Sequence, residues 1–320
     1  MRKSKFKIIV ILGPTSSGKS DVAIKLAQKY NGEIISADSR QIYQGMDMGT
    51  GKVPKSKCQN QNAKLFLKNK KIIPYVSSDI NHYLIDIVNP SVSYNVAKFK
   101  RDANYVINYV IKREKLPIIC GGTGFWIKAT VDDVFFPEVK PNKKLRKKME
   151  KLSTEKLFKM LQKLDLERAK NIDAKNKVRL IRAIEICEAI GKVPKVMEHG
   201  TWNMEHEFLQ IGIKVEKEKL QEKIKKRLEK RFKQGMIKEV EKLHRSGLSW
   251  KKIQSFGLGY FWIPLYLQGK INKKELFEKV YLAEKDYAKR QMTWFKKDGR
   301  IVWLKNYKEI DKKISAFIKN

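Results

Sequence analysis

Residues that build disulfide scaffolds and metal centres are scarce in this sequence. The 320 residues include 3 cysteines and 4 histidines. Cys58, Cys120 and Cys187 lack the spacing of metal ligands, and no histidine lies in a ligand motif. We therefore expect free thiols in a reducing compartment, which favours a cytoplasmic protein. No stretch approaches the roughly 20 apolar residues that a membrane-spanning helix needs, so we expect no membrane partner.

Negative charge is also scarce. The chain has 70 Lys and Arg against 34 Asp and Glu, which gives a formal net charge of +36. Such a charge attracts polyanions, of which nucleic acid is the usual one, and argues against a basic partner. Most of the basic residues are lysine, however, and a proteome-wide drift toward Lys, Ile and Asn would explain much of the excess equally well. The charge therefore permits an RNA partner without requiring one.

The most informative motif follows the apolar run 8–12. It reads Gly13-Pro14-Thr15-Ser16-Ser17-Gly18-Lys19-Ser20, the pattern G-x-x-x-x-G-K-[ST] of a phosphate-binding loop, and a helical pattern over 21–30 comes next. In such a loop the backbone amides converge on an anion at a helix N-terminus. Lys19 would hold the outer phosphate and the Ser20 hydroxyl would bind Mg²⁺. The alternative is a plain glycine turn, but the flanking pattern favours a polyphosphate site.

Short apolar runs alternate with helical patterns over the first 129 residues, which predicts a parallel sheet covered by helices on both faces. The expected strands are 6–13, 32–38, 82–88 and 116–122. Because ligands bind outside the carboxyl ends of parallel strands, the phosphate loop, Asp38 and the Gly121-Gly122-Thr123 turn should lie together at one edge of the sheet. The segment 60–75 begins with polar residues and is expected to be a surface loop.

Residues 130–206 have apolar residues at helical spacing and no convincing strand. A strand is expected at 208–215, followed by two long helices over 217–247 and 272–298. The fold class is therefore α/β, with a P-loop NTPase-like parallel-sheet core formed by 1–129 and 207–320 and a helical insertion domain over 130–206. In the first long helix, the apolar residues at 220, 224, 228 and 232 are interpreted as core packing.

Polar side chains follow the second and fourth expected strands. Asp38 could act as a general base, a magnesium ligand or a cap of the strand. Ser39, Arg40 and Gln41 come directly after it and suit recognition of bases and phosphates. Thr123 lies in a glycine-rich turn, where its hydroxyl either points into the site or has no role beyond the turn.

Three basic groups have both a binding and a structural interpretation. Arg179 and Arg182 lie three residues apart and could meet phosphates, unless Asp173 and Glu185 neutralise them. Arg227 and Arg231 lie four residues apart in a lysine-rich run of the kind that usually forms a solvated helix face. The segment 287–295, YAKRQMTWF, could stack a base and hold phosphate, or its aromatic residues could simply pack the last long helix.

Taken in order, these motifs resemble those of the bacterial tRNA dimethylallyltransferases. The matching segments are GPTSSGKS (13–20), ADSRQIYQGMDMGTGK (37–52), HYLIDI (82–87), LPIICGGTGFWIKA (116–129), NKVRLIRAIEI (176–186), the helix 223–235, GLGY (257–260) and YAKRQMTWF (287–295). The resemblance implies transfer of a dimethylallyl group from dimethylallyl diphosphate to the exocyclic amine of the adenosine just 3′ of the anticodon. It also implies that the insertion 130–206 contacts the anticodon stem-loop. We expect a monomer with Mg²⁺ as cofactor.

The resemblance also implies roles for individual residues. The phosphate loop would hold the diphosphate of the prenyl donor, with the help of Arg227. Asp38 would be the general base, with Thr15 beside it in the catalytic site, and Ser20 would bind the magnesium ion. The residues matching positions that contact tRNA are Asp38, Ser39, Arg40, Gln41, Thr123, Arg146, Val178, Arg179, Leu180, Ile181 and Arg182.

Two other functions remain open from the residues alone. A phosphate-loop kinase acting on a nucleoside or small metabolite would use ATP and would need a second acidic magnesium ligand, for which Asp86 is the candidate. An RNA-binding module with an inactive loop would bind tRNA with no dependence on diphosphate.

Overall fold

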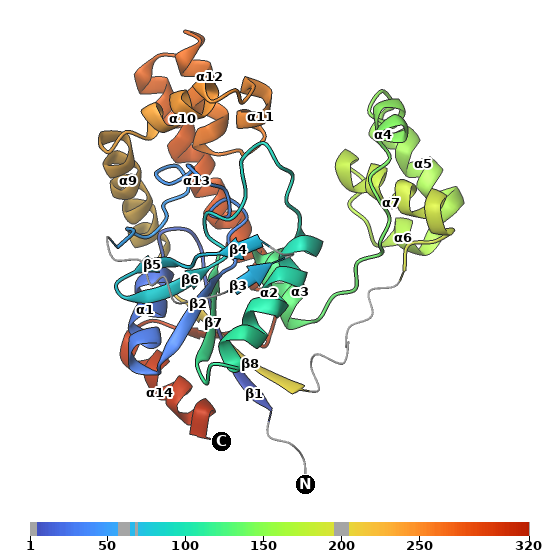
Figure 1. Cartoon of the computed structure of the whole chain (residues 1–320). Coiled ribbons are helices and arrows are strands. Elements are labelled where there is room, and N and C mark those ends of the chain that lie inside the picture. The colour runs from blue at the N-terminus through green and yellow to red at the C-terminus, as the bar shows by residue number, and fades with distance from the viewer. Residues whose placement is uncertain (1–4, 57–64, 68–69, 195–204, 320) are drawn as a thin grey trace. The chain divides into compact units, whose positions relative to one another are not determined.

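The computed structural model describes residues 5–56, 65–67, 70–194 and 205–319. The chain forms two compact units, one made of residues 1–133 with 201–320 and the other of residues 134–200 (Figure 1). The second unit is thus shorter at both ends than the expected insertion 130–206. Asp132 explains one boundary, because it pairs with Lys128 and Arg300, both of which belong to the first unit. No helix in the described ranges is long and apolar enough to cross a membrane.

The first unit is built on a seven-stranded sheet in the order β5-β6-β2-β7-β1-β8-β9. All its neighbouring strands are parallel except β5 and β6. The predicted parallel sheet is therefore confirmed. The bounds are β1 (Phe6–Leu12), β2 (Gly32–Ser36), β5 (Tyr75–Ser77), β6 (Ile80–Tyr83), β7 (Leu116–Gly121), β8 (His206–Ile213) and β9 (Val302–Leu304).

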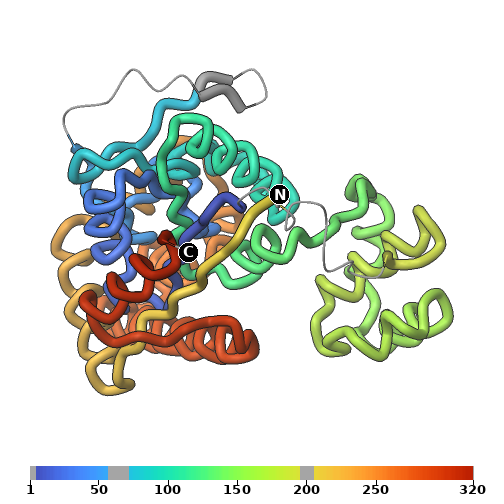
Figure 2. The backbone as a smooth tube through the Cα atoms, turned by 90° about the horizontal axis from the view of Figure 1, so that it is seen from below, coloured from blue at the N-terminus to red at the C-terminus, as the bar shows by residue number. Residues whose placement is uncertain are grey.

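The internal strand β1 contributes to two hydrophobic clusters of this unit, one on each face of the sheet. Ile8, Val10 and Leu12 lie in one buried cluster, whereas Ile9 and Ile11 lie in the other. Successive side chains of a strand point to opposite faces, so a continuous apolar run fits a strand that is covered on both sides. The first face is covered by helices that include α2 (Val96–Ile111) and α3 (Gly124–Val131), and the second by α1 (Lys19–Lys29) and α14 (Tyr307–Lys319). In Figure 2, α14 lies across β1 and β8.

Five further helices of this unit lie beyond the upper edge of the sheet in Figure 1. They are α9 (Lys217–Lys233), α10 (Met236–Arg245), α11 (Trp250–Gln254), α12 (Gly259–Leu267) and α13 (Lys273–Phe295). The apolar stripe of α9 packs into the core, as predicted: Ile224 and Leu228 are fully buried, and Phe232 packs against the same cluster as Leu228.

Two expectations for this unit were wrong. The segment 217–247 is not one helix but two, α9 and α10, because Gly235 adopts φ 102° between them, a left-handed conformation that an α-helix cannot contain. The expected loop 60–75 contains two short strands, β3 (Leu65–Leu67) and β4 (Lys70–Ile72), which pair antiparallel. Residues 60–64 and 68–69 lie outside the described residues.

The second unit has its own apolar core, formed by residues such as Leu157, Leu161, Leu180 and Ile184. Side-chain caps start its helices: the side-chain oxygens of Asn142, Ser153, Asp165 and Asn176 accept hydrogen bonds from backbone amides in the first turns. Its helices are α4 (Lys143–Met149), α5 (Thr154–Leu164), α6 (Leu166–Lys170) and α7 (Lys177–Ile190).

Candidate active site

The phosphate loop lies between the end of β1 and the start of α1. Gly18, at φ 87°, precedes the first helical residue, Lys19. Ser16 and Ser17 each have a buried hydroxyl oxygen that has no hydrogen-bond partner among the described residues. Buried polar groups are normally paired, so two unpaired hydroxyls in this loop fit an anion whose oxygens would complete them. These hydroxyls support an anion-binding loop over a plain glycine turn.

Two cationic side chains lie at the loop. Lys19 Nζ donates to Pro14 O at 3.2 Å, and Arg227 on α9 donates to Thr15 Oγ1 at 3.2 Å and to Gly51 O at 2.9 Å. Burial lowers the pKa of both cations, and the neighbouring charge of Arg231 lowers that of Arg227 further. Within the described residues neither cation forms an ion pair with a carboxylate. Two partly dehydrated positive charges that make no direct ion pair favour a bound anion.

Arg231 differs from Arg227 although both lie on α9. Its guanidinium is buried and pairs with Glu284 of α13, while it also donates to Gly49 O at 3.1 Å. The lysines between and around these arginines, such as Lys226 and Lys230, are exposed. The solvated face expected of this run therefore belongs to the lysines alone, because the arginines lie on the side of α9 that packs against the 49–51 turn.

Asp38 lies just beyond β2, on the same edge of the sheet. Its Oδ1 accepts hydrogen bonds from Arg40 N at 2.9 Å and Gln41 N at 3.4 Å, which fixes the turn that follows. The turn after β7 binds the two neighbours of Asp38. Thr123 Oγ1 accepts from Ser39 N at 3.0 Å, and Thr123 N donates to Ala37 O at 3.2 Å. Asp38 also interacts electrostatically with Lys19 and Arg227. The carboxylate and the two cations thus share one site.

Arg40 and Gln41 are held by segments distant in sequence. Arg40 Nε donates to Phe256 O at 2.7 Å, and the guanidinium lies over the ring of Phe256. Gln41 accepts from Ser36 Oγ at 3.2 Å. Gln41 also lines a small cavity of ≈ 20 Å³ whose wall includes Ser20, Ser36, His82 and Cys120. Burial lowers the pKa of His82 to about 4, so this histidine is neutral at physiological pH.

Two residues of the segment 287–295 lie on α13 at this site: Tyr287, an aromatic residue of the candidate base-stacking segment, and Gln291, to which sequence reasoning gave no role of its own. Gln291 is buried, accepts from Thr15 N at 2.8 Å and donates to Gly122 O at 2.8 Å, so it joins the phosphate loop to the turn after β7. Tyr287 contacts Thr123, and burial followed by the charge of Asp38 raises the pKa of its hydroxyl. A signal was available for Gln291, because it falls on the same stripe as the buried Val280, Ala288 and Phe295. A polar residue on an apolar stripe indicates a specific partner.

The second unit contains the other predicted RNA-contacting residues. Arg146 donates to both oxygens of Glu185, at 2.8 and 2.7 Å, and Arg182 binds the same carboxylate. Arg179 and Val178 are exposed, Val178 by 77%. Leu180 and Ile181, in contrast, have buried side chains in the core of this unit. The helical period turns these two side chains inward, and the contact of these positions with RNA stays a prediction.

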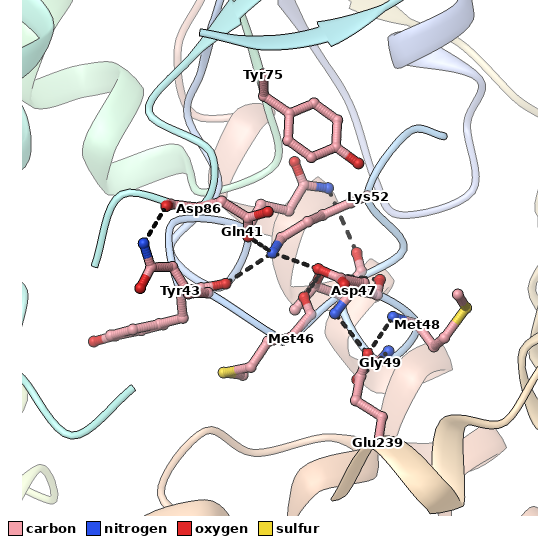
Figure 3. A network of polar contacts seen from close by, with 12 residues as sticks. Gln41, Tyr43, Met46, Asp47, Met48, Gly49, Lys52, Tyr75, Asp86 and Glu239 are labelled. Atoms are coloured by element: carbon pink, nitrogen blue, oxygen red, sulfur yellow. Dashed lines mark hydrogen bonds and ion pairs between the residues drawn. The ribbon is translucent and has the colours of Figure 1, made fainter. Parts of the chain in front are cut away.

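The candidate acid for a kinase is engaged elsewhere. Asp86 pairs with Lys52, whose buried amine also contacts Asp47 and the carbonyl of Tyr43 (Figure 3). The searched, described residues contain no group of three or more His, Cys, Asp or Glu side chains that could hold a metal ion. A magnesium ion at the phosphate loop would therefore depend on Ser20, a bound diphosphate and water. This is a common arrangement for Mg²⁺, which keeps several waters and binds substrate phosphates.

Comparison with known proteins identifies the family. The IPP transferase family matches residues 41–298. The tRNA dimethylallyltransferase of Caldicellulosiruptor saccharolyticus is 38% identical over 330 residues, covering 99% of this chain and 99% of that protein. The tRNA dimethylallyltransferase of Thermoanaerobacter sp. is 36% identical, covering 98% of this chain and 97% of that protein.

Two solved structures are similar over nearly their whole length. The tRNA isopentenylpyrophosphate transferase of Bacillus halodurans has a TM-score of 0.67 at 28% identity and covers 98% of this chain and 96% of its own. The tRNA delta(2)-isopentenylpyrophosphate transferase of Staphylococcus epidermidis has a TM-score of 0.65 at 32% identity and covers 98% and 99%. The motif resemblance is thus confirmed, and the chain belongs to the IPP transferase family, the family of the tRNA dimethylallyltransferases.

Proposed function

We propose that this chain, as a tRNA dimethylallyltransferase, moves a dimethylallyl group from dimethylallyl diphosphate to the N6 amine of the adenosine 3′-adjacent to the anticodon. The observation that carries the proposal is that hydrogen bonds through Thr123 and Gln291 join the segment after Asp38 to the phosphate loop, where Lys19 and Arg227 lie. A prenyl transfer needs both kinds of charge, because a proton leaves the amine while negative charge develops on the leaving diphosphate.

The bond changes follow from this arrangement. The N6 lone pair attacks the first carbon of the dimethylallyl group, the carbon–oxygen bond to the diphosphate breaks, and a proton passes from N6 to Asp38. The adenine amine is a weak nucleophile, so general-base assistance by Asp38 contributes roughly 10²–10⁴ in rate. Lys19, Arg227 and the loop amides stabilise the charge that develops on the diphosphate.

Magnesium is proposed as the cofactor at the same loop. When bound, Mg²⁺ supplies further neutralisation of the leaving diphosphate. Ser20, at the start of α1, would hold it together with oxygens of the substrate. The unpaired hydroxyls of Ser16 and Ser17 would then donate to the diphosphate beside it.

The proposed tRNA contacts lie on the half-buried residues around Asp38 and on the second unit. Ser39, Arg40, Gln41 and Thr123 surround Asp38 and would receive the target base, which must leave the loop stack at a cost of a few kcal/mol. Arg146, Arg179 and Arg182, with the exposed Val178, would contact the anticodon stem-loop from the insertion. The protein is proposed to act as a monomer in the cytoplasm.

One assay tests the reaction. Purified protein is incubated with labelled dimethylallyl diphosphate, Mg²⁺ and unmodified tRNA, with ATP present or absent. We expect label in the RNA, an equimolar release of diphosphate and no consumption of ATP. Turnover of ATP without labelled RNA would instead identify a kinase, and binding of tRNA that is indifferent to the diphosphate would identify an RNA-binding module.

A further inference from the structure

The carboxylate of Glu239, on α10, binds a turn of the first unit through its backbone. It accepts hydrogen bonds from three consecutive amides, Asp47 N at 2.6 Å, Met48 N at 2.7 Å and Gly49 N at 3.0 Å (Figure 3). Tyr260 donates a fourth, from its hydroxyl at 2.7 Å. Burial and the charge of Glu239 raise the pKa of Tyr260 well above its usual value, so that hydroxyl remains a donor.

The same turn contacts the two arginines of α9 through its carbonyls. Gly49 O accepts from Arg231 at 3.1 Å, and Gly51 O accepts from Arg227 at 2.9 Å. The second terminal nitrogen of Arg227 donates to Thr15 Oγ1 in the phosphate loop. A continuous series of hydrogen bonds therefore runs from Glu239 through the turn to Arg227 and the loop.

The turn and the Arg227 guanidinium lie in close contact. A Cβ built at Gly51 would lie 1.8 Å from the nearest nitrogen of Arg227, and one at Gly49 would lie 2.4 Å from the ring of Tyr260. Glycine is favoured at Gly51 by its φ of 61° as well as by the adjacent guanidinium, and at Gly49 by the ring of Tyr260 beside its backbone. A small shift of the turn would therefore move the Arg227 guanidinium.

We propose that Glu239 is a positioning residue for the prenyl donor: it fixes the 47–51 turn and, through Gly51 O, the orientation of the Arg227 guanidinium at the phosphate loop. The inference rests on the proposed function, in which Arg227 binds the diphosphate. A glutamate suits this task because one carboxylate accepts hydrogen bonds from all four donors at once, whereas no neutral side chain has as many acceptor sites.

Glu239→Gln tests the proposal with little change of shape. The amide keeps one acceptor oxygen but turns an NH₂ group toward backbone N–H donors, which frees part of the turn. We expect the Kd for inorganic pyrophosphate, measured by calorimetry, and the KM for dimethylallyl diphosphate to rise about tenfold, within the range for a misplaced binding group. The KM for tRNA should stay within twofold. Glu241→Gln, on the same helix in an exposed pair with Arg245, is the matched control and should change neither constant.

The direction of the effect separates positioning from simple electrostatics. Removal of a negative charge near the site would by itself strengthen the binding of an anion, so weaker pyrophosphate binding cannot come from the charge alone. Repeating Glu239→Gln in an Arg227→Met background completes a double-mutant cycle. If Glu239 acts through Arg227, Glu239→Gln should weaken pyrophosphate binding less than twofold in the Arg227→Met background.

Three results would overturn the proposal: an unchanged pyrophosphate Kd in Glu239→Gln, the same tenfold loss in the Arg227→Met background, or an equal rise in the KM for tRNA. Tyr260→Phe, which removes one of the four donors, should give a smaller loss of the same sign and substitutes for Glu239→Gln if that variant does not fold. If the wild type labels tRNA but Glu239→Gln leaves the pyrophosphate Kd and the donor KM unchanged, only the role of Glu239 is refuted. Wild-type protein that does not label tRNA would refute the proposed function itself.

Discussion

Asp38→Asn should remove the general base while leaving the turn around it intact. The side chain of Asp38 accepts from the amides of Arg40 and Gln41 through Oδ1 alone. An asparagine oxygen at the same place can accept both bonds, so the backbone that presents Ser39 and Thr123 should not move. What disappears is the ability to take a proton from N6. The expected loss in the rate of the chemical step is about 10²–10⁴, or about 3–5 kcal/mol in activation free energy.

The structure also predicts a change in binding. The negative charge of Asp38 lies near Lys19 and Arg227 and offsets part of the positive potential that a diphosphate would meet there. Asp38→Asn should therefore bind inorganic pyrophosphate as tightly as the wild type or more tightly. Single-turnover labelling of tRNA with saturating donor measures the chemical step, and calorimetry with pyrophosphate measures the binding. A single-turnover rate within threefold of the wild type would refute the role of Asp38 as base.

Three further outcomes are expected. Arg227→Met should weaken pyrophosphate binding by at least tenfold while tRNA affinity stays the same, and an unchanged pyrophosphate Kd would contradict its place at the diphosphate. Gln291→Leu leaves Thr15 N without its acceptor. It should lower the free energy of unfolding by about 1–3 kcal/mol and raise the KM for the prenyl donor. A variant equal to the wild type in thermal unfolding and in donor KM would exclude this bridge. Burial would raise the pKa of Glu185, but its hydrogen bonds with Arg146 prevail and lower it to about 2. The carboxylate therefore stabilises the second unit at neutral pH, and this stabilisation is lost as the pH falls from about 4.5 toward 2. Melting curves of wild type and Glu185→Gln between pH 2 and 7 should differ most at neutral pH, and a difference independent of pH would refute the assignment.

The parts of the fold that depend on local pattern could be predicted from the sequence. The run 8–12 had to be a strand buried on both faces, and the phosphate loop had to follow it, because apolar period and glycine placement are local properties. The break at Gly235 could have been foreseen, since a glycine between two amphipathic patterns is a common helix end. The meeting of Asp38 with the loop followed from the general rule for parallel sheets.

The contacts that complete the site could not be predicted in the same way. Whether Arg227 lies in solvent or beside Thr15 depends on the packing of α9 against a turn 176 residues earlier. The hydrophobic periodicity of the sequence carries no information about such a contact. Leu180 and Ile181 show the reverse problem. A motif that is matched as one segment assigns a binding role to every residue in it, including those whose side chains face the core. A helical wheel of 177–190 would have separated them from Val178 and Arg179.

The bridge made by Gln291 has a consequence for synthesis on the ribosome. The phosphate loop emerges early, yet its partner Gln291 lies 276 residues after Thr15, and β1 must also await β8 as a neighbour. A nascent chain that stops before α13 therefore carries the complete anion motif without the bridge that orders it. Translation products cut short in this region should lack the modifying activity even though every residue of the motif is present.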